Sequence, residues 1–110
     1  MSDPFAPVSV SDAKRRLDDG WTPYVLDVRS AAEVAVVQLD FADRATPHTE
    51  VLGLVDELPK DRDVLVYCKA GGRSAVACHM LAAAGFDRLY NLEGGIGAWV
   101  REIDPTLPQR

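Results

Sequence analysis

The chain has 110 residues, 47% of them hydrophobic, and its formal net charge at pH 7 is -5. This length suits a single domain, residues 1–110, with enough apolar side chains for a core that needs no metal or disulfide. The acidic balance argues against nucleic-acid binding, which relies on Lys and Arg to neutralise phosphates, and no apolar run approaches the ~20 residues of a membrane-spanning helix.

Short apolar runs alternate with longer amphipathic stretches along the chain, a pattern that predicts strands separated by helices. Residues 8–10 are expected to form a short edge strand. Ser11 is then expected to cap a helix that runs to about Asp19 and ends at Gly20. Residues 24–28 form the next predicted strand.

The following segment begins with a helix signal and then becomes irregular. Ser30 and Glu33 have the spacing of a capping box, so a short helix is expected to begin at Ser30. Residues 38–46 predict a loop that holds a short strand near Ala42. A further helix is predicted before Pro59, because apolar residues recur there at helical spacing. These residues are Val51, Leu54, Val55 and Leu58.

The C-terminal part of the chain predicts two more strands and two more helices. Residues 64–67 are a continuous apolar run, which is typical of a strand buried on both faces. Residues 74–84 are apolar nearly all round and predict a buried helix. Residues 89–92 are the last predicted strand, and a final amphipathic helix ends before Pro105. The apolar stripe of that helix consists of Ile96, Trp99, Val100 and Ile103.

This alternation of strands and helices predicts the fold class. Strands joined through helices pair in parallel, and the helices then cover both faces of the sheet. We therefore expect an α/β protein, a three-layer sandwich with a parallel sheet of about five strands.

The segment after the strand at 64–67 contains the candidate site. It reads Cys68, Lys69, Ala70, Gly71, Gly72, Arg73 and Ser74. Ligands of parallel sheets bind beyond the carboxyl ends of the strands, and glycines let successive N–H groups point at one spot near a helix N-terminus. Lys69 and Arg73 add positive charge. Such a cradle is expected to lower the pKa of the Cys68 thiol and to produce a thiolate nucleophile.

These residues resemble the active-site loop of rhodanese-like sulfurtransferases, and other stretches match that family in order and spacing. The matching stretches are Leu26-Asp27-Val28-Arg29 with Glu33, Ala84-Gly85-Phe86, and Leu92-Glu93-Gly94-Gly95-Ile96 with Trp99. The resemblance covers essentially the whole chain and implies the α/β sandwich already predicted. Residues 99–108 are also similar to the end of rhodanese domains fused to ThiF- and MoeB-type (MoeZ-like) adenylyltransferases, which activate ubiquitin-like sulfur carriers.

The resemblance implies a double-displacement reaction. The Cys68 thiolate would take sulfur from a small anionic donor such as thiosulfate, hold it as a persulfide and pass it to a thiophilic acceptor. A thiol or a ubiquitin-like sulfur-carrier protein is the expected acceptor. Residues 69–74 would bind the anionic group, with Arg73 either contacting the donor or bracing the loop. No cofactor is expected, and no metal, because no Cys/His spacing resembles a zinc site.

Two other functions compete with this hypothesis. Phosphatases and arsenate reductases of related shape place five residues between the loop cysteine and arginine, whereas four separate Cys68 from Arg73. Non-catalytic rhodanese-like binding or regulatory modules commonly replace the cysteine, and this chain retains it. Both alternatives are therefore less favoured than sulfur transfer.

Five residues outside the loop have simpler interpretations. Asp27 and Arg29 are expected at the mouth of the site as an ion pair that supports the loops, with substrate contact as the alternative. Cys78 is interpreted as a small core residue, with a resolving thiol for Cys68 as the alternative. His48 and His79 are isolated and are expected to be structural or exposed.

One segment departs from the family pattern. The family usually has a Gly-His-Ile-Pro-Gly-Ala type of stretch where residues 37–42 read Val-Gln-Leu-Asp-Phe-Ala, so the role of residues 37–46 is open. Residues 1–7 contain no basic or apolar leader, and there are only two cysteines. A cytoplasmic monomer with free thiols is therefore the expectation.

Overall fold

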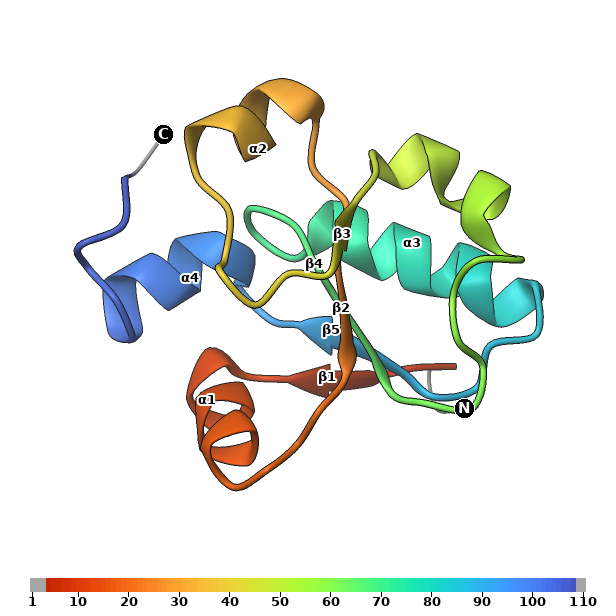
Figure 1. Cartoon of the computed structure of the whole chain (residues 1–110), viewed down its shortest axis with the longest axis horizontal. Helices are drawn as coiled ribbons and strands as arrows, with labels where there is room; N and C mark the ends of the chain where they lie inside the picture. Colours follow the sequence, from red (N-terminus) through yellow and green to blue (C-terminus); the bar gives the residue numbers. More distant parts are fainter. Residues whose placement is uncertain (1–3, 109–110) are drawn as a thin grey trace.

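A computed structural model describes residues 4–108 and contains one five-stranded parallel sheet in the order β1-β5-β4-β2-β3 (Figure 1). The strands are β1 (Ala6–Val8), β2 (Tyr24–Asp27), β3 (Arg44–Ala45), β4 (Val64–Tyr67) and β5 (Leu89–Leu92). The helices are α1 (Val10–Asp18), α2 (Ala31–Val36), the 3-10 helix η1 (His48–Leu54), α3 (Gly72–Ala83) and α4 (Gly95–Glu102). The predicted α/β sandwich is confirmed. Within residues 4–108, no helix has both the length and the hydropathy needed to cross a bilayer.

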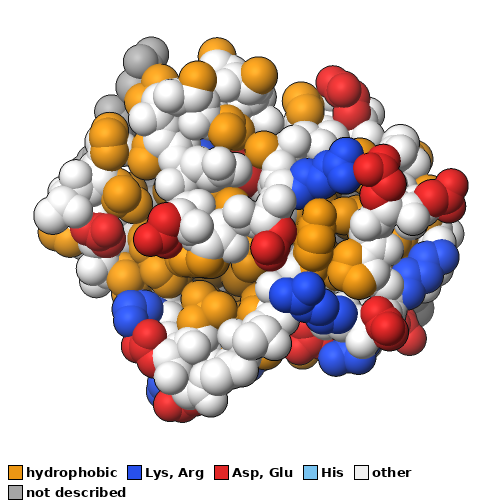
Figure 2. Space-filling view, viewed as in Figure 1, with side chains coloured by type: hydrophobic (Ala, Val, Ile, Leu, Met, Phe, Trp, Pro, Cys, Tyr) orange, Lys and Arg blue, Asp and Glu red, His pale blue; other side chains and the backbone are white. Residues whose placement is uncertain are grey.

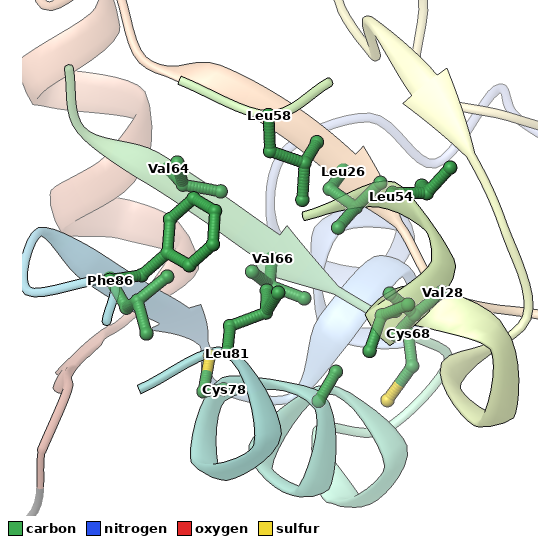
Figure 3. Close-up of a cluster of buried hydrophobic side chains, with 13 residues drawn as sticks. Leu26, Val28, Leu54, Leu58, Val64, Val66, Cys68, Cys78, Leu81 and Phe86 are labelled. Carbon is green, nitrogen blue, oxygen red and sulfur yellow. The ribbon is translucent and has the colours of Figure 1, made fainter. Parts of the chain in front are cut away.

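Side chains alternate between the two faces of the central strand β4, and this alternation places the candidate cysteine. Leu65 and Tyr67 belong to the hydrophobic cluster on the face covered by α1 and α4. Val64 and Val66 belong to the cluster under α3 and η1, and Cys68 continues that series (Figure 3). The period of two along a strand therefore directs the Cys68 side chain toward the N-terminal end of α3.

The predicted positions of the first strand and of the first helix cap are wrong by two residues. The first strand ends at Val8, and Val10 already belongs to α1 instead of to the strand. Ser9, not Ser11, caps that helix, because its hydroxyl oxygen accepts the backbone N–H of Asp12 at 3.1 Å. The N–H group of Asp12 lies in the first turn of α1 and has no acceptor within the helix, so the Ser9 hydroxyl takes the place of that acceptor.

Two elements in the middle of the chain also differ from the prediction. The short strand expected near Ala42 lies at residues 44–45, beside the end of β2. The helix expected to continue to Leu58 is a 3-10 helix that ends at Leu54. The capping box of Ser30 and Glu33 is present as predicted.

A buried ion pair supports the segment that departs from the family pattern. Arg29 Nη2 lies 2.7 Å from Asp27 Oδ2, and the two side chains are 3% and 0% exposed. The same nitrogen donates to the carbonyl oxygen of Val37 at 2.6 Å. The hydroxyl of Tyr67 accepts the backbone N–H of Leu39 at 3.2 Å. Arg29, which follows β2, and Tyr67 of β4 thus fix the chain at residues 37–39.

Breaking this pair should destabilise the protein strongly. Arg29→Ala leaves the Asp27 carboxylate buried without its cation, and we expect the free energy of unfolding to fall by about 3–5 kcal/mol in urea titrations at neutral pH. Arg44→Ala is the matched control, because it breaks the exposed pair with Glu57 and should change stability little. Similar losses in the two variants would contradict a structural role for the buried pair.

Candidate functional site

The Cys68 thiol lies at the carboxyl end of β4 among hydrogen-bond donors. The residue is 1% exposed, and its Sγ atom accepts the backbone N–H of Gly71 at 3.0 Å. Ser74 Oγ lies 3.3 Å from the same sulfur. Burial by itself would raise the pKa of this thiol, but hydrogen bonds from Ser74, Gly71 and Ala70 outweigh burial and lower the pKa below its ordinary value. The surroundings therefore favour a thiolate at Cys68.

The loop that provides these donors turns at a glycine. Gly71 precedes α3 as its N-cap and has a φ angle of 105°, in the left-handed region that residues with side chains rarely adopt. The turn directs the chain from β4 into the first turn of α3. Unpaired N–H groups and the positive end of the helix dipole therefore lie close to Sγ, where they stabilise a negative charge.

Helix α4 holds the other side of the loop through backbone hydrogen bonds. The N–H groups of Ile96 and Gly97 donate to the carbonyl oxygens of Cys68 and Lys69, both at 2.9 Å. A Cβ atom on Gly95 would collide with the Cys68 carbonyl oxygen and lie 2.6 Å from the carbonyl carbon of Lys69. Gly95 therefore lets the first turn of α4 pack directly on the loop and bind its carbonyl groups.

A residue that the sequence analysis did not single out completes the buried surroundings of the thiol. Ser74 Oγ donates to Asn91 Oδ1 at 2.5 Å, and Asn91 Nδ2 donates to the Gly71 carbonyl oxygen at 3.3 Å. Ser74 is 0% exposed and Asn91 7%. The available signal was a single amide residue among the apolar residues of the strand at 89–92.

Arg73 is engaged by an acidic residue from another helix. Its Nη1 and Nη2 atoms donate to the two carboxylate oxygens of Glu33, at 2.7 and 2.8 Å. This bidentate contact lowers the pKa of Glu33 to about 2, and the Ser30 hydrogen bonds of the capping box contribute. The guanidinium thus joins α3 to the start of α2.

A small hollow adjoins the loop on the side of α4. Its volume is about 130 Å³. Lys69 and Arg101 contribute exposed cationic side chains to it, and neither forms a salt bridge with any residue between 4 and 108. On the face shown in Figure 2, several acidic and basic side chains lie next to one another. The hollow therefore offers positive charge beside the loop of a chain that is acidic as a whole.

The remaining residues singled out in the sequence form no hydrogen bond with the Cys68 thiol within the part of the chain that the structure describes. Cys78 is free and fully buried, and burial raises its pKa to about 12. Its sulfur lies 3.9 Å from the carbonyl oxygen of Tyr90, and Figure 3 draws it apart from the sulfur of Cys68. His79 packs edge-on against Phe5 with ring centroids 5.0 Å apart. These contacts fit core and surface roles.

The fold and site together define an α/β protein with a cysteine in a backbone cradle that favours anions. The family profile described as "Rhodanese-like domain" matches residues 9–102, and the chain belongs to that family.

Individual relatives agree with this assignment. A sulfurtransferase of Allochromatium vinosum is 40% identical over 93 residues, which cover 84% of this chain and 86% of that protein. The probable adenylyltransferase/sulfurtransferase MoeZ of Mycobacterium tuberculosis is 37% identical over 83% of this chain, but the match spans only 24% of MoeZ. The crystal structure of a Staphylococcus aureus rhodanese-like domain protein superposes with a TM-score of 0.81 at 25% identity, covering 96% of this chain and 99% of that one.

The contact between α4 and the loop can be tested at Gly95. In Gly95→Ala the new Cβ atom meets the loop carbonyl groups while φ stays at 58°, so we expect a loss of at least about 2 kcal/mol in the free energy of unfolding. The pKa of Cys68, measured from the pH dependence of alkylation, should also rise as the loop is displaced. Gly53→Ala is the matched control, since nothing lies within 4 Å of its Cβ position. If Gly95→Ala keeps the Cys68 pKa and the unfolding free energy of the unmodified protein, the contact between α4 and the loop does not position the loop.

The Glu33–Arg73 contact predicts a particular pH dependence of stability. The pKa of Glu33 is lowered from 4.5 to about 2, so its contribution is fully present above pH 4.5 and is lost as the pH falls toward 2. The difference in unfolding free energy between the unmodified protein and Glu33→Gln should therefore be largest near neutral pH and narrow below pH 4.5. The difference in unfolding free energy between the unmodified protein and Arg73→Gln should narrow over the same pH range. A difference that is constant between neutral pH and the acid limit of folding would contradict this assignment.

Proposed function

We propose that this chain is a sulfurtransferase that carries sulfane sulfur as a persulfide on Cys68. The observation that carries the proposal is the position of Sγ at the N-terminal end of α3, 3.0 Å from the Gly71 nitrogen, with hydrogen bonds that lower the pKa of the thiol. Membership of the rhodanese-like family supports the same class of reaction.

In the first half-reaction, the Cys68 thiolate attacks the outer sulfur of a donor such as thiosulfate. A new sulfur–sulfur bond forms at Sγ, the sulfur–sulfur bond of the donor breaks, and sulfite leaves with the bonding electron pair. The negative charge then rests on the outer sulfur of the persulfide. Backbone N–H groups of the loop are preorganised donors for that charge and need little rearrangement to hold it.

In the second half-reaction, a thiophilic acceptor attacks the outer sulfur. The bond to Sγ breaks and Cys68 returns to the thiolate, so the cycle has no net redox change at the protein. The acceptor in this step is a thiol, or cyanide in an assay. A ubiquitin-like sulfur-carrier protein would follow another route: the outer sulfur attacks the carrier's activated C-terminal carbonyl carbon and displaces the activating group, and a thiol then attacks Sγ, which releases the thiocarboxylate and leaves Cys68 in a disulfide with that thiol. The alignment with MoeZ supports the carrier as a physiological partner.

The hollow beside the loop suits the approach of the donor. Lys69 and Arg101 attract a small dianion from solvent, and the loop N–H groups receive it near Sγ. Arg73 serves in this proposal as a brace, because both of its terminal nitrogens bind Glu33. The four-residue spacing and this engagement of Arg73 favour a sulfur atom over a tetrahedral oxyanion as the occupant of the loop.

Intact-mass measurement after incubation with thiosulfate tests the proposal. The protein should gain the mass of one sulfur atom, and added cyanide should remove it as thiocyanate. Cys68→Ser should gain nothing, whereas Cys78→Ala, which retains the loop thiol, should gain the same mass as the unmodified protein.

A negative result is equally informative. If Cys68 stays reduced and unmodified with thiosulfate and with other sulfane-sulfur donors, the chain is a rhodanese-like binding module and not a sulfurtransferase. If the protein instead hydrolyses phosphate esters or reduces arsenate, the oxyanion alternative is correct.

A further inference from the structure

The Ser74 hydroxyl lies between two groups that both accept hydrogen bonds. Its oxygen is 2.5 Å from Asn91 Oδ1 and 3.3 Å from Cys68 Sγ. A serine hydroxyl has one proton to donate. When that proton goes to Asn91, Cys68 satisfies the remaining contact only as a thiol that donates its own proton to Ser74. A thiolate has no proton and requires the one held by Asn91.

Asn91 is fixed in the orientation that creates this competition. Its Nδ2 atom donates to the Gly71 carbonyl oxygen at 3.3 Å. Turning the amide over would place Oδ1 against that carbonyl and set two acceptors facing each other. Because Cys68, Ser74 and Asn91 are all at least nine-tenths buried, water does not readily replace either hydrogen bond.

We propose that Asn91 is a positioning residue for Cys68, which acts by competing with the thiolate for the Ser74 hydroxyl proton. The competition disfavours negative charge on Sγ itself. The competition does not change the stability of the neutral thiol. It does not change the stability of the persulfide either, because the charge of a persulfide lies on the outer sulfur. The competition keeps the free thiolate basic and therefore reactive. If Cys68 carries sulfur as proposed above, the competition also favours the persulfide over the free thiolate.

The charged and titratable groups on the elements around Cys68 do not change in the test variants. They are Asp27 at the end of β2 and Arg29 just after it, His48 at the start of η1, Lys69 in the loop, and Arg73 and Cys78 on α3. A pKa shift that depends on Ser74 therefore reports the shared proton and not one of these groups.

Asn91→Leu tests the competition, because leucine has a similar size but no acceptor. The freed Ser74 proton should stabilise the thiolate, and we expect a roughly tenfold larger thiolate fraction at a pH below the pKa. The pH profile of Cys68 alkylation, followed by mass, measures this fraction. In a Ser74→Ala background the same substitution should shift the profile little.

Asn91→Asp separates this effect from simple loosening of the loop. Both substitutions remove the hydrogen bond to Gly71, but aspartate keeps the acceptor oxygen and adds negative charge, so it should raise the pKa of Cys68. Opposite shifts in Asn91→Leu and Asn91→Asp are therefore expected. Shifts in the same direction, or equal shifts with and without Ser74, would overturn the proposal. If Asn91→Leu does not fold, Asn91→Asp with and without Ser74→Ala provides the same comparison, and its shift should be smaller without Ser74.

The two proposals fail independently. The alkylation profile needs no sulfur donor, so it tests Asn91 whether or not Cys68 accepts sulfur. At a fixed ratio of thiosulfate to sulfite, above the pKa of the thiol, Asn91→Leu should also reduce the ratio of persulfide to free thiolate by roughly tenfold. A pKa shift without any sulfur loading would reject the persulfide function and retain the role of Asn91.

Discussion

The backbone contact between α4 and the loop after β4 sets the direction in which the loop's polar groups point. Two N–H groups at the start of α4 bind the carbonyl oxygens of Cys68 and Lys69. Because a peptide's N–H and C=O groups point in opposite directions, engaging the carbonyl groups at α4 leaves later N–H groups of the loop facing the sulfur. This arrangement needs a glycine at position 95, where any Cβ would collide with the loop. Two segments that are distant in sequence thus together form the surroundings of the Cys68 thiol.

The electrostatics of the site come from pairing, not from the net charge of -5. Asp27 and Arg29 neutralise each other in the interior, and Arg73 binds Glu33 at the edge of the loop. Lys69 and Arg101 are left beside the hollow without salt bridges among residues 4–108. An acidic protein can therefore attract a small anion to one place, since exposed charges act mainly within about one Debye length, roughly 10 Å.

The sequence was most predictive where local pattern and burial agree. The strands at 64–67 and 89–92 were predicted to the residue, because each is a short, largely apolar run bounded by polar residues or turns. Prediction failed where long-range contacts decide the structure. The bonds from Arg29 and Tyr67 shape residues 37–39, and nothing in that segment encodes them. Asn91 was missed for a similar reason, since its partner Ser74 lies 17 residues away.

The cradle has to treat two anions differently if the proposed cycle operates. The charge lies on Sγ before sulfur is taken up and on the outer sulfur afterwards. Strong stabilisation of the first anion would lower the nucleophilicity of the thiolate, because nucleophilicity falls with pKa. Around Sγ the protein provides one close backbone N–H, from Gly71, and a hydroxyl whose proton Asn91 also accepts. In the proposed cycle the charge moves outward with the sulfur, away from the hydroxyl for which Asn91 competes, so the competition at Ser74 opposes the first anion and not the second.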